Sequence, residues 1–230
     1  MSRLVVVTGG TRGIGAAIAA RFREAGDQVV APGRADCDVT DEAAVTAFFA
    51  ALGPVDVLVN NAGISTSAPL ARTSLADWQA QHEVNATGAF LCTRAVLPGM
   101  RERDSGRIVT VASTAGHAGY KYTAGYTASK HAAVGLTRAV AAEVAGTGVT
   151  SNAVCPAFVR TDMTRTSIAR ISGSTGRDEA EAEAALAAAS PLGRLLEPEE
   201  VAFAVAFLAA PEAAAVNGQT IVLDGGGIQS

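Results

Sequence analysis

Short runs of apolar residues alternate along the chain with longer stretches whose apolar positions recur with helical spacing. The apolar runs predict strands at residues 4–7, 28–31, 55–59, 108–112, 149–154 and 220–223. Helices are expected at residues 13–25, 41–51, 75–100, 124–145 and 198–208. The strands are continuously apolar and do not alternate apolar with polar positions. This pattern predicts an α/β fold, in which helices cover both faces of a doubly wound parallel sheet.

Composition and charge exclude several classes of function. The net charge is -4 and no cluster of Lys or Arg is present, so we expect no nucleic-acid partner. The apolar run near the start, residues 4–7, is too short for a signal peptide or a membrane span, which predicts a cytoplasmic protein. Cys37, Cys92 and Cys155 lack metal-ligand spacing with the histidines, so we predict reduced structural thiols and no metal site.

A glycine-rich loop, residues 8–15, follows the first predicted strand and opens the first helix. Glycines let the backbone approach a pyrophosphate closely, and the free N–H groups of a helix start favour its negative charge. A tight turn that binds nothing is the alternative, but the strand before it and the helix after it favour a dinucleotide site. The candidate cofactor-binding residues here are Gly9, Thr11, Arg12, Gly13, Ile14 and Gly15.

Tyr126 and Lys130 lie one helical turn apart, on the same face of a predicted helix. A nearby cation stabilises a phenolate, so we expect Lys130 to lower the pKa of Tyr126 and make it a general acid or base. The alternative is an ordinary surface pair. Ser113 ends the preceding strand and can hydrogen-bond a substrate oxygen, although a serine at a strand end often only satisfies the backbone.

These motifs, together with Asn60-Asn61-Ala62-Gly63 and Asn85, resemble in order and spacing the short-chain dehydrogenase/reductase family. The resemblance continues through Cys155-Pro156, Thr161, residues 191–194 and residues 223–226, so it covers essentially the whole chain. It implies one Rossmann domain over residues 1–230, with a mostly parallel seven-stranded sheet. The members it most resembles are 3-oxoacyl-thioester reductases and 3-hydroxyacyl-CoA dehydrogenases.

By this resemblance Tyr126 would transfer the proton, Lys130 would also grip the nicotinamide ribose, and Ser113 would polarise the substrate oxygen. Asn85 would hold a water that links Lys130 to solvent. Further cofactor contacts implied by the family are Asp38, Val39, Asn60, Ala62, Gly63, Pro156 and Thr161.

The second predicted strand carries no acid at its end, where a carboxylate would bind the ribose of NAD. Arg34 lies one step beyond, and Arg12 can add a second positive contact, so NADP(H) is preferred; Asp36 keeps NAD(H) possible. The chain reaches Asp38 almost directly after Arg34, so the sheet is expected to be shortened after the second strand. A second departure is Ala157, which stands where the family commonly has glycine; its methyl group is acceptable unless φ is positive.

Residues at about 160–195 are predicted to form a lid over the substrate. The first part holds Arg160, Arg165, Arg170 and Arg177 against only Asp162. Such a basic start suits the phosphates of a CoA-linked or carrier-protein-linked thioester, and solvated arginines are the alternative.

We therefore expect an enzyme acting on a small carbonyl or alcohol substrate, with a 3-oxoacyl thioester as the first hypothesis. Another ketone, such as a sugar, steroid or secondary metabolite, is the main alternative. A non-catalytic nicotinamide-binding regulator is another. The family also implies a homotetramer built through the long helices at residues 75–100 and 124–145. Small residues of the second helix would permit this, or would face the chain's own core: Ala132, Ala133, Gly135, Ala139 and Ala142.

Overall fold

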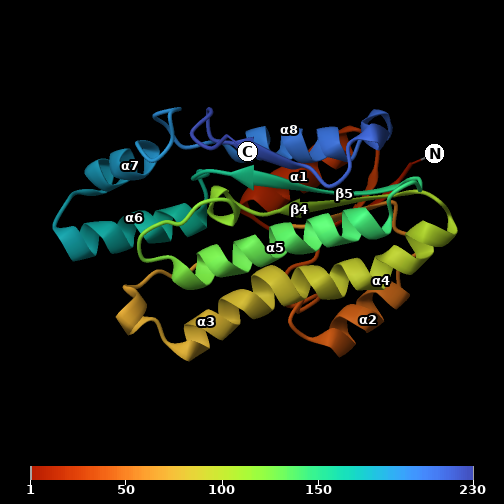
Figure 1. Cartoon of the computed structure of the whole chain (residues 1–230), viewed down its shortest axis with the longest axis horizontal. Coiled ribbons are helices and arrows are strands. Elements are labelled where there is room, and N and C mark those ends of the chain that lie inside the picture. The colour runs from red at the N-terminus through yellow and green to blue at the C-terminus, as the bar shows by residue number, and fades with distance from the viewer. Residues whose placement is uncertain (1, 230) are drawn as a thin grey trace.

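Six parallel strands form one sheet at the centre of the computed structural model, which describes residues 2–229 (Figure 1). The strands are β1 Leu4–Val7, β2 Gln28–Val30, β3 Val57–Asn60, β4 Gly106–Val111, β5 Val149–Pro156 and β6 Thr220–Leu223. Their order is β2-β1-β3-β4-β5-β6. The chain therefore reverses direction across the sheet between β1 and β3, and ligands bind at such a point outside the carboxyl ends of the strands.

The doubly wound Rossmann architecture is confirmed, but the prediction of seven strands is wrong. The sheet has six strands because residues 31–41, between β2 and helix α2, are too few for a further helix and strand. The short spacing after Arg34 was the reason to expect a sheet shortened after the second strand, and that expectation is confirmed. Strand β2 is consequently the edge of the sheet.

Helices cover both faces because successive strand side chains point to opposite sides. Val5 and Val7 pack with Phe22 on the face covered by α1 Gly13–Glu24 and α8 Pro198–Leu208. Val6 packs with Met100 on the other face. That face is covered by α2 Glu42–Ala50, α4 Gly88–Glu102 and α5 Ala124–Glu143.

The helix expected at residues 75–100 has an irregular centre. It consists of α3 Leu75–His82, a π-helical turn at Glu83–Thr87, and α4, which together form one long rod in Figure 1. A π-turn inserts an extra residue into a helix and often marks a functional position. Here it contains Asn85, whose side chain is buried.

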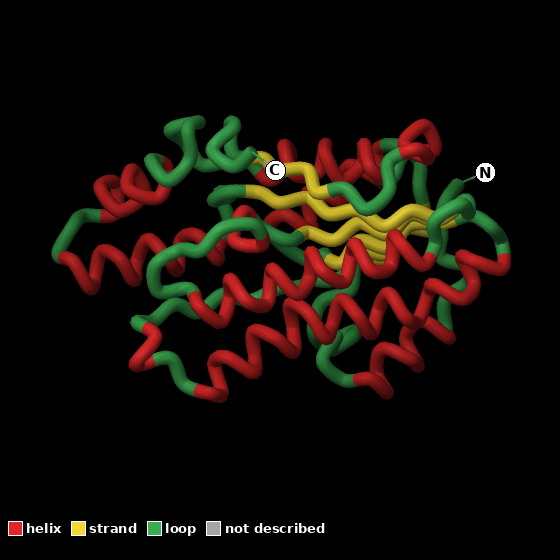
Figure 2. Tube along the Cα trace, in the orientation of Figure 1, coloured by secondary structure: helices red, strands yellow, loops and turns green. Residues whose placement is uncertain are grey.

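The 160–195 segment extends beyond the end of the sheet, as Figure 2 shows. It contains α6 Asp162–Thr175 and α7 Glu179–Ala187. Short 3-10 turns lie elsewhere, at Leu70–Arg72 (η1), Thr114–Gly116 (η3) and Pro211–Ala215 (η4). Over residues 2–229, none of the helices has both the length and the apolar character to cross a membrane.

Candidate active site

The glycine loop between β1 and α1 has a backbone that larger residues cannot adopt. Gly9 and Gly13 have φ of +62° and +51°. A Cβ on Gly15 would lie 2.3 Å from the carbonyl oxygen of Gly9, closer than any real contact. Helix α1 also begins without a side-chain cap and without an acid in its first turn, so its first N–H groups are free to bind an anion. The loop therefore fits the pyrophosphate of a dinucleotide.

Thr8 and Asn61 join this loop to the one after β3. The Thr8 hydroxyl oxygen accepts hydrogen bonds from the N–H groups of Asn61 and Ala62, both at 3.1 Å. The Asn61 amide donates back to the carbonyl oxygens of Thr8, at 2.9 Å, and Gly9, at 3.1 Å. Sequence analysis did not identify either residue as a connector. Thr8 and Asn61 directly follow strands that are neighbours in the sheet, and this position was the one sign in the sequence that they connect the two loops.

Asn60 lies one residue before this connection and is buried at the end of β3. Its amide nitrogen donates to the Thr93 hydroxyl at 2.9 Å, which ties β3 to α4. Gly63 follows in the same loop, where a Cβ would lie 3.7 Å from the ammonium nitrogen of Lys130. The loop after β3 is therefore placed between the glycine loop and the Tyr126 region.

Tyr126 and Lys130 lie in the first two turns of α5, and the Lys130 ammonium is buried. The ammonium nitrogen donates to the carbonyl oxygen of Val111, at the end of β4, over 2.9 Å. It also lies 5.7 Å from the centre of the Tyr126 ring. Burial lowers the pKa of Lys130 to about 8. Lys130 therefore lies in the protein interior with Tyr126 half-buried beside it, which excludes the alternative of an ordinary surface pair.

The expected lowering of the Tyr126 pKa is wrong for the protein alone. Burial raises the pKa of Tyr126 above its usual value, and the Ser113 side chain only opposes that rise. The physical reason is that Lys130 directs its hydrogen bond to Val111 and not to the phenol oxygen. Tyr126 consequently remains protonated through neutral pH, which is the form needed to donate a proton.

Ser113 follows β4 and lies near Tyr126. Its hydroxyl oxygen accepts a hydrogen bond from the Ala115 N–H at 3.1 Å, so it caps the short turn η3 as a strand-end serine does. The hydroxyl proton is not needed for that bond and can be donated to another oxygen. Cys155 is buried beside these residues, and burial raises its thiol pKa to about 11, so it remains protonated.

Asn85 connects the π-turn to two segments of the site. Its amide oxygen accepts from the Ile64 N–H at 2.8 Å, and its amide nitrogen donates to the Ile64 carbonyl at 3.0 Å. The same nitrogen donates to the Ser129 hydroxyl at 2.9 Å, and Ser129 in turn donates to the Tyr126 carbonyl. Ser129 was missed by sequence analysis, although it stands directly before Lys130.

The loop after β2 places the predicted adenosine contacts in a compact corner. Arg34 forms an ion pair with Asp38 at 3.0 Å, while its side chain is 86% exposed. Hydrogen bonds from Thr40, supported by Arg34, hold the pKa of Asp38 below its usual value. Asp36 accepts from the Gly33 N–H. Arg12 is exposed and has no side-chain partner among residues 2–229.

Val39 is buried in the same corner and packs against the start of α4, where a Cβ on Gly88 would lie 2.7 Å from its side chain. On the opposite side of the glycine loop, Pro156 ends β5 and Thr161 caps α6. A Cβ on Gly13 would lie 3.3 Å from the Thr161 methyl carbon. The start of α6 therefore adjoins the cofactor loop. Ala157 has no positive φ, so its methyl group is tolerated there.

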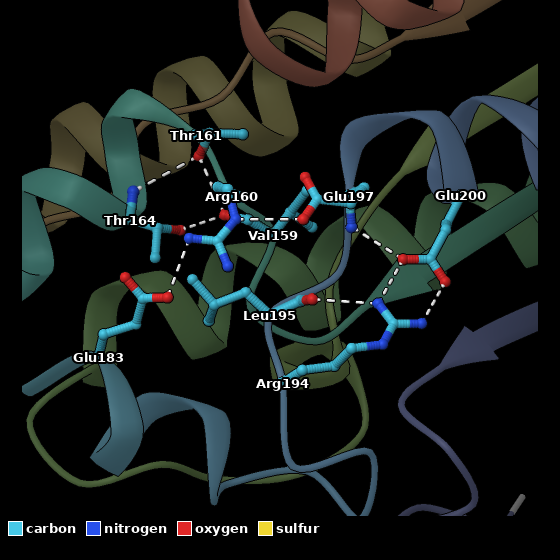
Figure 3. A network of polar contacts seen from close by, with 9 residues as sticks. All are labelled: Val159, Arg160, Thr161, Thr164, Glu183, Arg194, Leu195, Glu197 and Glu200. Carbon is cyan, nitrogen blue, oxygen red and sulfur yellow. Dashed lines mark hydrogen bonds and ion pairs between the residues drawn. The ribbon is translucent and has the colours of Figure 1, made fainter. Parts of the chain in front are cut away.

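Ion pairs fix the 160–195 segment at both ends, as Figure 3 shows. Arg160 pairs with Glu183 of α7 at 2.9 Å and with Glu197 before α8 at 3.1 Å. Arg194 pairs with Glu200 of α8 at 2.7 Å. Backbone hydrogen bonds join the same two stretches of chain, between Arg160 and Leu196 and between Leu196 and Phe158. Within residues 2–229, no group of three or more potential metal ligands is found.

Comparison with known proteins gives a consistent family. The family model described as Enoyl-(Acyl carrier protein) reductase matches residues 31–227. The chain is 42% identical over 255 residues to a putative ketoacyl reductase of Streptomyces coelicolor, covering 98% of this chain and 97% of the relative. It is 39% identical over 247 residues to an acetoacetyl-CoA reductase of Shinella zoogloeoides, covering 98% of each.

Among solved structures, a single-residue variant of actinorhodin polyketide ketoreductase with NADPH is similar with a TM-score of 0.89 and 38% identity. The match covers 98% of this chain and 97% of that one. The similarity therefore extends over essentially the complete fold.

The affinity for a dinucleotide is expected to fall above pH 8. Lys130 has a pKa of about 8 and is charged below it, whereas Cys155 titrates near 11 and the raised pKa of Tyr126 keeps that phenol neutral. Loss of the ammonium charge weakens attraction for an anionic cofactor. Fluorescence titration with NADPH from pH 6 to 10 measures this. A Lys130→Met variant should bind weakly at a constant level, and a wild-type affinity that stays constant to pH 10 would contradict the assignment.

Proposed function

The chain belongs to the short-chain dehydrogenase/reductase family, and on that premise we propose that it reduces the 3-oxo group of acyl thioesters with NADPH. The observation that carries the proposal is the group formed by half-buried Tyr126 and buried Ser113 and Lys130, which lie after β4 and at the start of α5. It combines a phenol that keeps its proton with a serine hydroxyl, and both can donate a hydrogen bond to the carbonyl oxygen of the substrate. Two hydrogen-bond donors toward one oxygen stabilise the negative charge that develops on a ketone.

Each residue has a separate part in this proposal. NADPH, when bound, supplies the hydride. Tyr126 donates its proton to the carbonyl oxygen, and Ser113 hydrogen-bonds that oxygen as it becomes an alkoxide. Lys130 holds the nicotinamide ribose and stabilises the phenolate left on Tyr126. Asn85 keeps the Ile64 and Ser129 segments in place, and we assign to it the water that returns a proton from solvent toward Lys130.

The cofactor lies, in this proposal, across the glycine loop. Gly9, Thr11, Gly13, Ile14 and Gly15 line its pyrophosphate. Asp38, Val39, Asn60, Ala62 and Gly63 line its adenosine side, and Pro156 and Thr161 line its nicotinamide. Arg12 and Arg34 meet the 2′-phosphate that distinguishes NADPH from NADH. Arg12 contributes more, because Arg34 already has Asp38 as a partner.

A 3-oxoacyl thioester is favoured as substrate by the relatives, which are named a ketoacyl reductase and an acetoacetyl-CoA reductase. The 160–195 segment serves as the lid over this substrate, on the single domain that residues 1–230 form. We place the enzyme in the cytoplasm, which suits its three free cysteines.

We further propose a homotetramer. One exposed stripe on α5 consists of the small residues Ala132, Gly135, Ala139 and Ala142. Packing against the chain's own core accounts only for Ala133, which is buried. A second helix can approach such a stripe closely. Phe203 and Phe207 on α8 are 61% and 50% exposed and offer a second apolar surface.

Acetoacetyl-CoA should be reduced with consumption of NADPH, and crotonyl-CoA, which has a double bond in place of the ketone, should not. Tyr126→Phe is expected to lower kcat by roughly 10³-fold while the Kd for NADPH changes little, because only the proton donor is lost. The absorbance of NADPH measures the rate of reduction, and fluorescence titration measures the Kd for NADPH. Reduction of crotonyl-CoA alone, or an active Tyr126→Phe variant, would overturn the proposal.

Arg12→Ala should weaken NADPH binding about tenfold, and Arg34→Ala by a smaller factor, since a phosphate dianion gains a charge-assisted hydrogen bond from each. NADH, which lacks the 2′-phosphate, is the matched control and should bind both variants as it binds the wild type. Wild-type protein that prefers NADH would show that these arginines are only surface charges.

Ala139→Arg should reduce the mass in solution from four chains of 23.2 kDa to a smaller assembly, because the new side chain separates the α5 stripes. Light scattering after size exclusion measures the mass. The same substitution at Ala180, on the exposed side of α7, should leave it unchanged. A wild-type monomer at micromolar concentration is the result that excludes the tetramer.

A further inference from the structure

The lid arginines have unequal electrostatic environments. Arg160 pairs with Glu183 and Glu197, and Arg165 forms an ion pair with Asp162. The predicted basic start of the lid is therefore compensated at these two residues. The partners of Arg160 lie far from it in sequence, and the partner of Arg165 is three residues away. Arg170 and Arg177 have no acidic partner among the described residues.

Arg170 is the lid arginine that contacts the loop after β3. Its guanidinium donates to the Ser67 hydroxyl at 2.7 Å, although the two residues are 103 positions apart. Ser67 is in the loop that begins with Asn60-Asn61-Ala62-Gly63 and therefore leads directly from the cofactor site. A neutral hydroxyl leaves the positive charge of Arg170 uncompensated.

The face of α6 that carries Arg170 is apolar at the N-terminal end of the helix. Met163 and Arg170 are seven residues apart, which places them on one side of the helix, two turns or about 10 Å from each other. Met163 is 41% exposed, and it stands two residues after Thr161, beside the glycine loop. Since Arg170 contacts Ser67, this face of α6 lies toward the loop after β3. It runs from an apolar residue near the chemistry to a cation at the outer end.

The loop before α5, which contacts the Ser67 loop, contributes a strained aromatic residue and a second exposed cation. Tyr122 has φ of +68°, a conformation that costs a non-glycine residue free energy, and it is 62% exposed. Its carbonyl oxygen accepts from the Ala68 N–H at 2.9 Å, which holds it beside Ser67. Lys121 precedes it and is exposed, with no side-chain partner among the described residues.

From this arrangement we propose that Arg170, assisted by Lys121, binds the phosphate of the pantetheine arm that carries the acyl chain. The inference rests on the proposed function and specifies how its substrate is held. The acyl group lies toward Met163 and Tyr126, and the phosphate displaces Ser67 from Arg170. The pantetheine phosphate is common to CoA and to an acyl carrier protein, so the site serves either source.

The test compares three acetoacetyl thioesters: those of CoA, of an acyl carrier protein, and of N-acetylcysteamine, which ends before the phosphate. Arg170→Ala should raise KM about tenfold for the first two, leave both kcat values unchanged, and leave the N-acetylcysteamine reaction unaffected. Arg170→Lys, which keeps the charge, should recover most of the lost affinity. Arg165→Ala is the matched control, because Arg165 lies on the other side of α6 in an ion pair, and it should change none of the three.

Each other outcome contradicts the assignment. An equal loss with N-acetylcysteamine would show a general disturbance of the substrate site. A loss confined to CoA would point to its adenosine phosphates, and one confined to the carrier protein would point to the protein surface. Wild-type enzyme that reduces none of the three thioesters overturns the proposed function itself. Reduction of all three with no effect of Arg170→Ala overturns only the role of Arg170.

Discussion

The buried ammonium of Lys130 is the constraint on which the rest of the site depends. An ammonium ion removed from water must find hydrogen bonds or lose its proton. Here one bond, to the Val111 carbonyl, fixes α5 against the end of β4 and sets the height of Tyr126 above the sheet. One neutral oxygen compensates the charge only in part, which is why the pKa of Lys130 falls to about 8. In the proposed complex, the hydroxyl oxygens and negative charge of the cofactor would supply the remaining compensation, which would couple cofactor binding to the proton chemistry.

The parallel sheet makes this arrangement possible because every strand ends at the same edge. β1 supplies Thr8 and the glycine loop, β3 supplies the loop with Asn61, β4 supplies Ser113, and β5 leads to Thr161. The loops are then joined by side-chain hydrogen bonds to the backbone, such as those from Asn61 to Thr8 and Gly9. The π-turn acts from outside the sheet: it lies between α3, which packs on α5, and α4, which packs on β3 and β4, and it turns Asn85 toward Ser129 of α5.

All six strands and most helices were predictable from the sequence, but helix α6 was not predicted, nor were several interactions within the site. Apolar strands and helical periodicity are local signals, so β4 and α5 lie within a few residues of their expected bounds. The pKa of Tyr126 was predicted in the wrong direction because the degree of burial and the partner of Lys130 depend on packing between α5 and β4. Glu183 and Glu197 lie 23 and 37 residues after Arg160, and no periodicity links them to it. The predicted number of strands was wrong because seven strands is the pattern of the family. The short spacing after Arg34 in this sequence already indicated that one outer strand is missing.

The missing outer strand affects the cofactor corner and leaves the catalytic centre intact. β2 has three residues and is only partly buried, whereas all eight residues of β5 are buried. The proposed catalytic groups stand directly after β4 and in the first two turns of α5, and strands β1 and β3 lie between β4 and the shortened edge. A short edge strand also offers little backbone for unwanted pairing with another chain. The shortening affects the loop after β2, which contains the predicted adenosine contacts and in which Asp38 holds Arg34 in an ion pair. In the proposed NADPH complex, recognition of the 2′-phosphate by Arg34 would compete with the Asp38 carboxylate, whereas Arg12 has no side-chain partner within residues 2–229.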